Sequence, residues 1–144
     1  MGEEYKNKNI ALSLLDDEAS GNLTEALKKL HPKYSMTWMY VDKYGNKFPE
    51  HRGVEEEDFE PIYDIIGREY HIKNVISNSD VVMIEVVESY PSQQSDGSYS
   101  KFVTPEVIVL EFVRGKVRRG RHYCDPRVSH LHVPEKDIMQ IFER

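Results

Sequence analysis

The stretch KFVTPEVIVLEFVRGKVRRGRHYCD, positions 101 to 125, constrains the fold more than any other part of the chain. Two long segments predicted as strands, KFVTPEVIVLEFV and KVRRGRHYCD, are separated only by Arg114 and Gly115, a pattern that predicts a β-hairpin with a two-residue turn. A turn this short fixes the register of the two strands. Counted outward from the turn, the predicted pairs are Val113 with Lys116, Glu111 with Arg118 and Glu106 with Tyr123.

Side chains alternate between the two faces of such a ribbon. With this register, one face groups small side chains around His122, and we expect it to be concave and to line a pocket. The predicted pocket face holds Val107, Val109, Gly120, His122 and Cys124. The other face mixes aliphatic, Arg and Tyr side chains, as protein interfaces do, and predicts a homodimer through the sheet. That face holds Glu106, Ile108, Leu110, Phe112, Arg119, Arg121 and Tyr123.

The segment GKVRRGRHYCDPR carries five cations in a chain whose net charge is −6. Strand alternation divides these cations between two faces, and the acidic residues at positions 55 to 60 offer partners. We therefore expect ion pairs here, with Arg118 bound to Glu111, in place of a phosphate-binding stripe. No nucleic-acid partner is predicted, because nucleic-acid binding relies on a basic face.

The rest of the chain alternates helices and strands. Apolar spacing predicts one helix around Ile10 to Leu15 and a second that begins after the N-cap Asn22 and ends by Pro32. A strand over 34–41 precedes a third helix over 54–66, which contains Pro61. Strands over 68–77 and 80–90 then lead to the hairpin. This order predicts one α+β domain over 1–144, with a curved antiparallel sheet packed against the helices.

Composition narrows the class of protein. No apolar run approaches the ~20 residues that a membrane span needs, and the N-terminal MGEEYKNKN lacks the apolar core of a signal peptide. The single cysteine, Cys124, excludes an internal disulfide framework. We therefore expect a cytoplasmic protein without a membrane partner.

The segment GKVRRGRHYCDPR is similar to the Gly-Lys-Ile … Arg-x-Tyr-x-Asp-Pro ending of the nuclear transport factor two-like superfamily. Within that superfamily the chain resembles the SnoaL-like or ketosteroid-isomerase-like domains, and the resemblance covers nearly the whole chain. It implies a cone of curved sheet closed by three helices, usually dimeric, with an apolar pocket inside. Members include isomerases, dehydratases, polyketide cyclases, epoxide hydrolases and binding proteins, so the resemblance alone does not fix an activity.

The catalytic residues of these enzymes are not conserved in the chain. His122 stands where limonene-epoxide-hydrolase-like and SnoaL-like enzymes carry an aspartate. The Arg and Asp that the hydrolases place two residues apart match Val86 and Glu88. The general-base aspartate of the steroid isomerases falls near Thr37 and Trp38, where the chain has no carboxylate.

His122 is the first candidate for chemistry, because imidazole titrates near neutral pH and can serve as general acid or base. The alternative is a neutral core histidine. Glu88 is expected to orient His122 or to act as base, and otherwise to be an exposed strand carboxylate. Tyr40 and Tyr63 are the predicted donors to a developing oxyanion, and Trp38 is predicted to shape the pocket. Core packing is the alternative for Trp38 and Tyr63.

Cys124 and His122 lie on one strand face and could begin a metal site, with His130 or His132 as a third ligand. Catalytic zinc sites usually take three protein ligands that converge in space. Because the sequence offers no such cluster, we expect neither a metal nor a cofactor. Asp125 is predicted to cap the strand end and pair with Arg127.

Three functional hypotheses remain open. The first is an enzyme that transfers protons on an apolar small molecule by isomerisation, dehydration or cyclisation. The second is a non-catalytic binding module for a hydrophobic ligand. The third is a dimeric interaction domain whose cone is filled by its own side chains. Polar groups that converge in the pocket would favour the enzyme, an all-apolar cavity would favour the binder, and a filled cone would favour the third.

Overall fold

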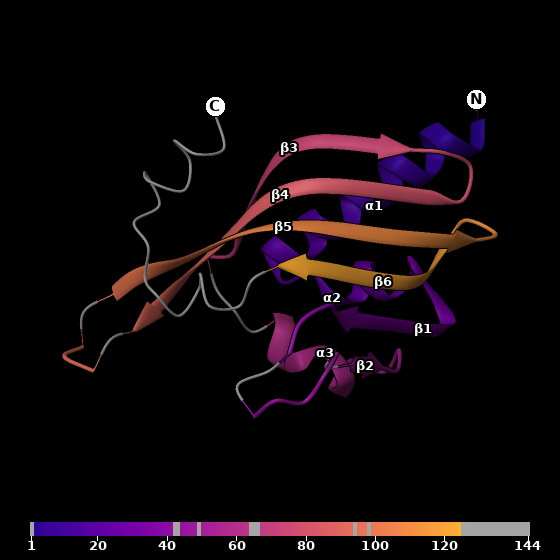
Figure 1. The fold of residues 1–144 in the computed structure, drawn as a ribbon. Helices are drawn as coiled ribbons and strands as arrows, with labels where there is room; N and C mark the ends of the chain where they lie inside the picture. Colours follow the sequence, from indigo (N-terminus) through magenta and orange to yellow (C-terminus); the bar gives the residue numbers. More distant parts are fainter. Residues whose placement is uncertain are drawn as a thin grey trace.

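The computed structural model describes residues 2–41, 44–48, 50–63, 67–93, 95–97 and 99–124. Within these ranges six strands form one curved, open sheet in the order β2-β1-β6-β5-β4-β3 (Figure 1). The helices lie together on one side of that sheet. The elements are α1 (Gly2–Ser20), α2 (Leu23–Leu27), β1 (Leu30–Trp38), β2 (Glu50–Arg52), α3 (Glu56–Tyr63), β3 (Glu69–Ser77), β4 (Val81–Gln93), β5 (Tyr99–Val113) and β6 (Lys116–Cys124).

This architecture confirms the predicted α+β cone. One ladder differs from the prediction of an antiparallel sheet, because β1 pairs with β6 in parallel. The core lies between α1, α3 and the concave face of the sheet. Its buried residues include Ala11, Leu14, Leu15, Phe59, Val82, Ile84, Val86, Ile108, Leu110, Phe112 and Val117.

The second helix begins as predicted and ends early. The side chain of Asn22 accepts a hydrogen bond from the Glu25 amide, so the predicted N-cap is confirmed. The prediction that this helix continues toward Pro32 is wrong, because Leu30 already begins β1 and Pro32 lies inside that strand. Proline is tolerated there because β1 is out of register with β6 at this point.

The third helix starts at Glu56, two residues later than predicted, and Pro61 lies inside it. Sequence analysis missed β2, a strand of three residues that pairs with β1. Gly67 takes a φ of 84°, a left-handed conformation that favours glycine after a helix. Among the described helices, none is both long and apolar enough to cross a membrane.

The β5–β6 hairpin contains a bulge that overturns the predicted register. Val113 faces Lys116 and Phe112 faces Val117, but Glu111 then faces Arg119 instead of Arg118. One extra residue on β6 shifts every later pair by one position and changes which side chains share a face. The inner face therefore combines Ile108, Leu110 and Phe112 with Gly120 and His122, and the predicted pocket face of β5 was wrong.

Candidate active site

Ionisable side chains from four strands gather on the concave face. Glu88 on β4 lies opposite Tyr70 on β3 and diagonally across from Glu106 on β5. Glu106 is in turn diagonal to His122 on β6, which faces Trp38 on β1. Diagonal neighbours on one face are within reach of long side chains. The buried charged cluster consists of Glu18 on α1, Arg68 before β3, and Tyr70, Glu88, Glu106 and His122.

Arg68 is the cation of the buried charged cluster. Its guanidinium Nη1 lies 3.2 Å from Glu18 Oε1 and 3.4 Å from Glu88 Oε1, and it donates to the Tyr70 hydroxyl at 3.4 Å. The guanidinium also lies over the ring of Tyr90, 5.8 Å from its centroid. The Arg68 side chain is only 7% exposed, so these ion pairs are formed largely away from water.

Three carboxyl groups share this one cation, so they cannot all be ionised cheaply. Burial, followed by the neighbouring charge of Glu106, raises the pKa of Glu88 to about 8. Burial likewise raises the pKa of Glu106 to about 7. A hydrogen bond joins the two carboxyl groups. Near neutral pH Glu88 therefore holds a proton that it donates to the Glu106 carboxylate.

His122 lies beside this carboxyl pair. Its Nδ1 is 3.7 Å from Glu106 Oε2, and its ring centroid is 6.4 Å from that of Trp38. Burial lowers the pKa of His122, so the imidazole is neutral at pH 7. The arrangement thus places a proton donor, a proton acceptor and a neutral imidazole on one sheet face. Such a set can perform general acid–base chemistry.

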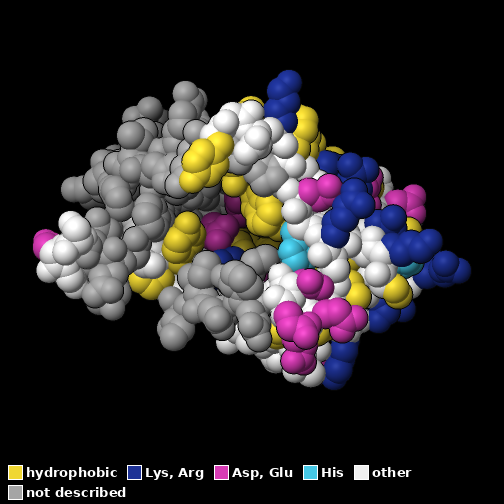
Figure 2. Space-filling model, turned by 90° about the horizontal axis from the view of Figure 1, so that it is seen from below, with side chains coloured by type: hydrophobic (Ala, Val, Ile, Leu, Met, Phe, Trp, Pro, Cys, Tyr) yellow, Lys and Arg dark blue, Asp and Glu magenta, His cyan; other side chains and the backbone are white. Residues whose placement is uncertain are grey.

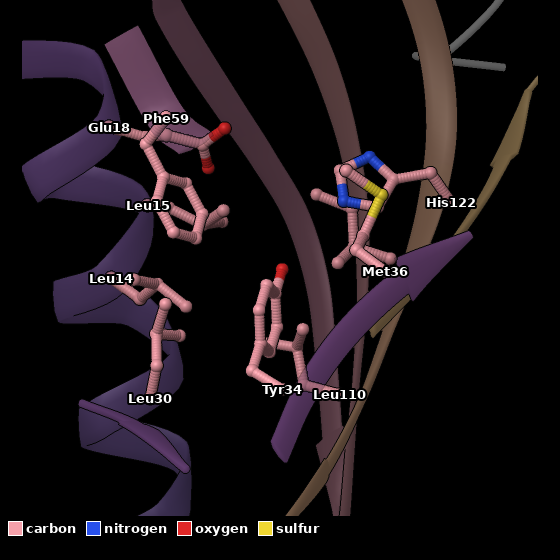
Figure 3. Close-up of a pocket in the computed structure, with 10 residues that line it drawn as sticks. Leu14, Leu15, Glu18, Leu30, Tyr34, Met36, Phe59, Leu110 and His122 are labelled. Atoms are coloured by element: carbon pink, nitrogen blue, oxygen red, sulfur yellow. The ribbon is translucent and has the colours of Figure 1, made fainter. Parts of the chain in front are cut away.

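An apolar cavity lies between α1 and the concave face of the sheet, and His122 is one of its lining residues. Figure 3 shows Glu18 reaching into it from α1 and His122 from β6, with the Tyr34 hydroxyl directed between them. Its volume is about 30 Å³, enough for roughly two water molecules. Its other lining residues are Leu14, Leu15, Leu30, Met36, Phe59, Ile108 and Leu110.

The space-filling view shows a hollow on the side of the molecule seen from below Figure 1. Acidic and basic side chains lie at the bottom of this hollow, and hydrophobic side chains surround it (Figure 2). Two buried polar atoms, Arg68 Nε and Glu106 Oε1, have no hydrogen-bond partner among the residues that the structure describes. Buried polar atoms are normally paired, so these two atoms could each form one more hydrogen bond.

The structure brings several of the predicted site residues together. His122 and Glu88 belong to the buried charged cluster, Trp38 contacts the His122 ring, and Gly120 lies beside Met36 and the Tyr34 hydroxyl. Tyr40 follows the end of β1 and lies near Tyr90, whose pKa is raised by burial first and by several neighbours that include Tyr40.

Other predicted residues lie elsewhere. Val107 and Val109 point to the outer face of the sheet, because the β6 bulge reverses their pairing. Cys124 is half-buried and lies opposite Glu106, on the same sheet face as His122, although it is not among the described residues that line the cavity. The Tyr63 side chain and the residues Asp125, Arg127, His130 and His132 lie outside the described residues. In the described part of the chain no group of three metal-ligating side chains converges.

Sequence reasoning missed Glu18, Arg68, Tyr34 and the inward direction of Glu106. Glu106 was assigned to the outer face because the hairpin was counted without a bulge. Glu18 lies on a helix of weak amphipathicity, and Arg68 lies between elements, so neither position carried a periodic signal. An acidic residue in the run TPEVIVLEF is the one signal that could have pointed to Glu106, because a central strand seldom buries a charge without a partner.

Solved structures with a similar fold are known, although they have little sequence identity to this chain. No family model matches the sequence, and no curated protein matches it. Among solved structures, a candidate SnoaL-like polyketide cyclase from Jannaschia is 13% identical with a TM-score of 0.71, over 94% of this chain and 96% of that one. A nuclear transport factor two-like protein of unknown function from Cytophaga hutchinsonii is 12% identical, with a TM-score of 0.62 over 84% and 91%. A phenazine biosynthesis-related protein from Pseudomonas aeruginosa is 10% identical, with a TM-score of 0.66 over 91% and 92%.

Proposed function

We propose that this chain, which has the nuclear transport factor two-like fold, is an enzyme that transfers protons on a small, largely apolar molecule held in the cone. The observation that carries the proposal is the hydrogen-bonded pair of Glu88 and Glu106, with His122 3.7 Å from Glu106. Pairs of titratable groups whose environments separate their pKa values are typical of acid–base catalysis.

The roles follow from the protonation states. Glu106, with a pKa of about 7, is the general base that removes a proton from carbon. Glu88, with a pKa of about 8, is the acid that donates a proton to the substrate oxygen or returns one to carbon. His122 positions Glu106 and can take the proton onward, while Trp38 fixes the His122 ring. The role of Tyr40 as an oxyanion donor stays a prediction.

The substrate class follows from the unpartnered atoms. A carbonyl oxygen can accept the free Arg68 Nε–H, and an acidic hydrogen next to that carbonyl can face Glu106 Oε1. The reaction is then an isomerisation, a dehydration or a cyclisation. Met36 has three rotatable bonds and lines the cavity, so its movement is the simplest way to admit an apolar substrate.

The small cavity favours a second candidate function. A volume of about 30 Å³ is close to a filled cone, as expected of a dimeric interaction module or of a binder that opens only for its ligand. Exchange of hydrogen for deuterium distinguishes the two. An enzyme of the proposed type incorporates solvent deuterium at carbon in a panel of small ketones and enones, while a binding or interaction module leaves every compound unlabelled.

The pH dependence of that exchange is expected to be bell-shaped. Activity rises as Glu106 loses its proton near pH 7 and falls as Glu88 ionises near pH 8. In Glu88→Gln a neutral amide replaces the protonated acid, so the fall on the alkaline side should disappear. The acid limb should stay near pH 7, because the Gln amide is neutral like the protonated Glu88 and can still donate a hydrogen bond to Glu106.

Exchange rates measured from pH 5 to 9 check this expectation. Glu85→Gln is the matched control, because Glu85 lies on the same strand and bonds to Asn74 at the surface. An alkaline limb that persists unchanged in Glu88→Gln would remove Glu88 from the mechanism.

A homodimer through the outer face of the sheet is also proposed. Support comes from four apolar side chains at neighbouring register positions, Ile76, Met83, Val107 and Tyr123, which are 71%, 47%, 37% and 43% exposed. Arg121 and Glu111 lie beside them on the same face, 3.0 Å apart. In a two-fold interface each face meets itself, so opposite charges on one face can pair with those of a second copy.

Met83→Glu is therefore expected to convert the dimer to a monomer, because it places a carboxylate in the centre of the apolar patch. Size-exclusion chromatography with light scattering measures the mass. Tyr44→Ser removes an apolar side chain that is 77% exposed elsewhere, and it should leave the dimer intact. A wild-type protein that is monomeric at about 100 μM, far above usual dimer dissociation constants, would show that this proposal is wrong.

A further inference from the structure

Two irregularities at the start of β1 and β6 shape the outer surface of the sheet. The β6 bulge leaves Arg118 as the extra residue between Val117, which faces Phe112, and Arg119, which faces Glu111. The parallel pairing of β1 with β6 also shifts register between Leu30 and Ser35. Bulges redirect side chains and often adjoin functional sites. Here they place Arg118 beside Lys33, whose carbonyl oxygen accepts a hydrogen bond from the Arg118 guanidinium.

A cationic depression lies at this place, defined by Lys33, Ser35, Arg52, Arg118 and Arg119. It consists of two adjoining hollows of about 390 and 470 Å³ that share Ser35, Arg52 and Arg118. Ser35 faces Arg52 on one side and Arg119 on the other, so the two guanidinium groups flank the serine on one face. Among the described residues that line the smaller hollow there is no acidic side chain, whereas Glu50 and Glu111 line the larger hollow beside the arginines.

The positive charge of the cationic depression is only partly neutralised. Arg52 is paired with Glu50 at 2.9 Å, but the predicted pair of Arg118 with Glu111 does not form. Glu111 lies opposite Arg119 and is bound by Arg121 at 3.0 Å. Within the part of the chain that the structure describes, Lys33, Arg118 and Arg119 therefore have no carboxylate partner.

The cations of the depression also affect the pKa of the neighbouring His31. Partial desolvation, followed by the charges of Arg118, Arg114 and Lys33, lowers the pKa of His31. A region of positive potential thus persists on a chain whose net charge is −6. A long polyanion would meet that overall negative charge, whereas a compact anion meets only the local cations.

We propose that the cationic depression binds the phosphate group of a small phosphorylated molecule. Guanidinium groups donate two parallel hydrogen bonds to phosphate oxygens, as Arg119 can from one side of Ser35. Arg52, on the other side, already donates from Nε and Nη2 to Glu50 and adds its remaining donor and its charge. Lys33 and Arg118 supply further charge, and the Ser35 hydroxyl supplies a donor. This site lies on the outer face and is independent of the proton-transfer chemistry proposed for the concave face.

Titration with inorganic phosphate and with phenyl phosphate, followed by amide NMR, tests the proposal. Saturable shifts are expected at the amides of Lys33, Ser35, Gly53 and Arg119. Arg119→Gln should weaken binding at least about tenfold, since a hydrogen bond to a charged group is lost. Lys6→Gln removes the same charge from the exposed surface of α1 and should leave the affinity unchanged.

The two probes separate the possible sources of the anion. Equal affinity assigns the site to the phosphate group alone, and tighter binding of phenyl phosphate assigns it to an organic phosphate; both results support the proposal. Shifts that do not saturate, or equal weakening in Arg119→Gln and Lys6→Gln, would overturn it. Binding to vesicles of phosphatidylserine and phosphatidylcholine without binding to either phosphate probe would overturn it as well.

Discussion

Glu106→Gln is expected to lower the rate of solvent-deuterium exchange at pH 7.5 by about 10² to 10⁴-fold, the usual contribution of a general base. The amide cannot accept a proton, but it keeps the size of the buried side chain and can still accept a hydrogen bond from Glu88. The fold should therefore survive. His122→Ala in the same assay should lower the rate as well.

The double variant of Glu106 and His122 gives the sharper result. Because the two groups lie 3.7 Å apart and act together in the proposed mechanism, their losses should not multiply. Circular dichroism and thermal unfolding confirm that each variant is folded. Full exchange activity in Glu106→Gln would exclude Glu106 as the base, whatever the behaviour of His122→Ala.

Arg68→Met is expected to reduce the free energy of unfolding by about 3–5 kcal/mol at pH 8, as when one partner of a buried ion pair is removed. Arg68 is 7% exposed and holds Glu18 and Glu88, so its loss leaves two buried carboxyl groups without a cation. Chemical denaturation at several pH values measures the effect. Arg52→Met is the control, because the Arg52 side chain is 78% exposed and its surface ion pair contributes little.

The free energy of unfolding that Arg68→Met loses is expected to be larger at high pH than at low pH. In the folded variant the carboxyl groups have pKa values further above the unfolded value of 4.5, so the native state binds more protons than the unfolded state. Stability therefore falls as pH rises above 4.5 and continues to fall through the folded pKa. Glu18→Gln together with Glu88→Gln should recover part of the stability that Arg68→Met loses. A loss that is the same at pH 5 and pH 8 would contradict this account.

The sequence was sufficient for the overall fold because its strongest signals are local. Asn22 caps its helix as predicted, and the segments predicted as the last four strands form the neighbouring strands β3 to β6. Pairings that depend on distant segments were not predictable in the same way. The parallel contact of β1 with β6 and the three-residue β2 arise from tertiary packing, which overrides weak local preference.

The candidate site was only partly predictable for a related reason. His122 and Glu88 were identified from residue type and strand position, and both lie in the buried charged cluster. One bulge residue, Arg118, reversed the inferred face of Glu106 and of Val107 and Val109. A two-residue turn sets the register only at the turn, and nothing in KVRRGR marks where the ladder gains an extra residue.

The central claim is that Glu88 and Glu106 share a proton near neutral pH beside a neutral His122. Carbon-13 NMR titration of the glutamate side-chain carboxyl carbons tests it without any substrate. Two carboxyl groups are expected to titrate near pH 7 and pH 8, and Glu88→Gln should remove the transition near pH 8 and leave the one near pH 7. If Glu88 and Glu106 both titrate below about pH 5, close to ordinary glutamates, the proton-sharing pair does not exist.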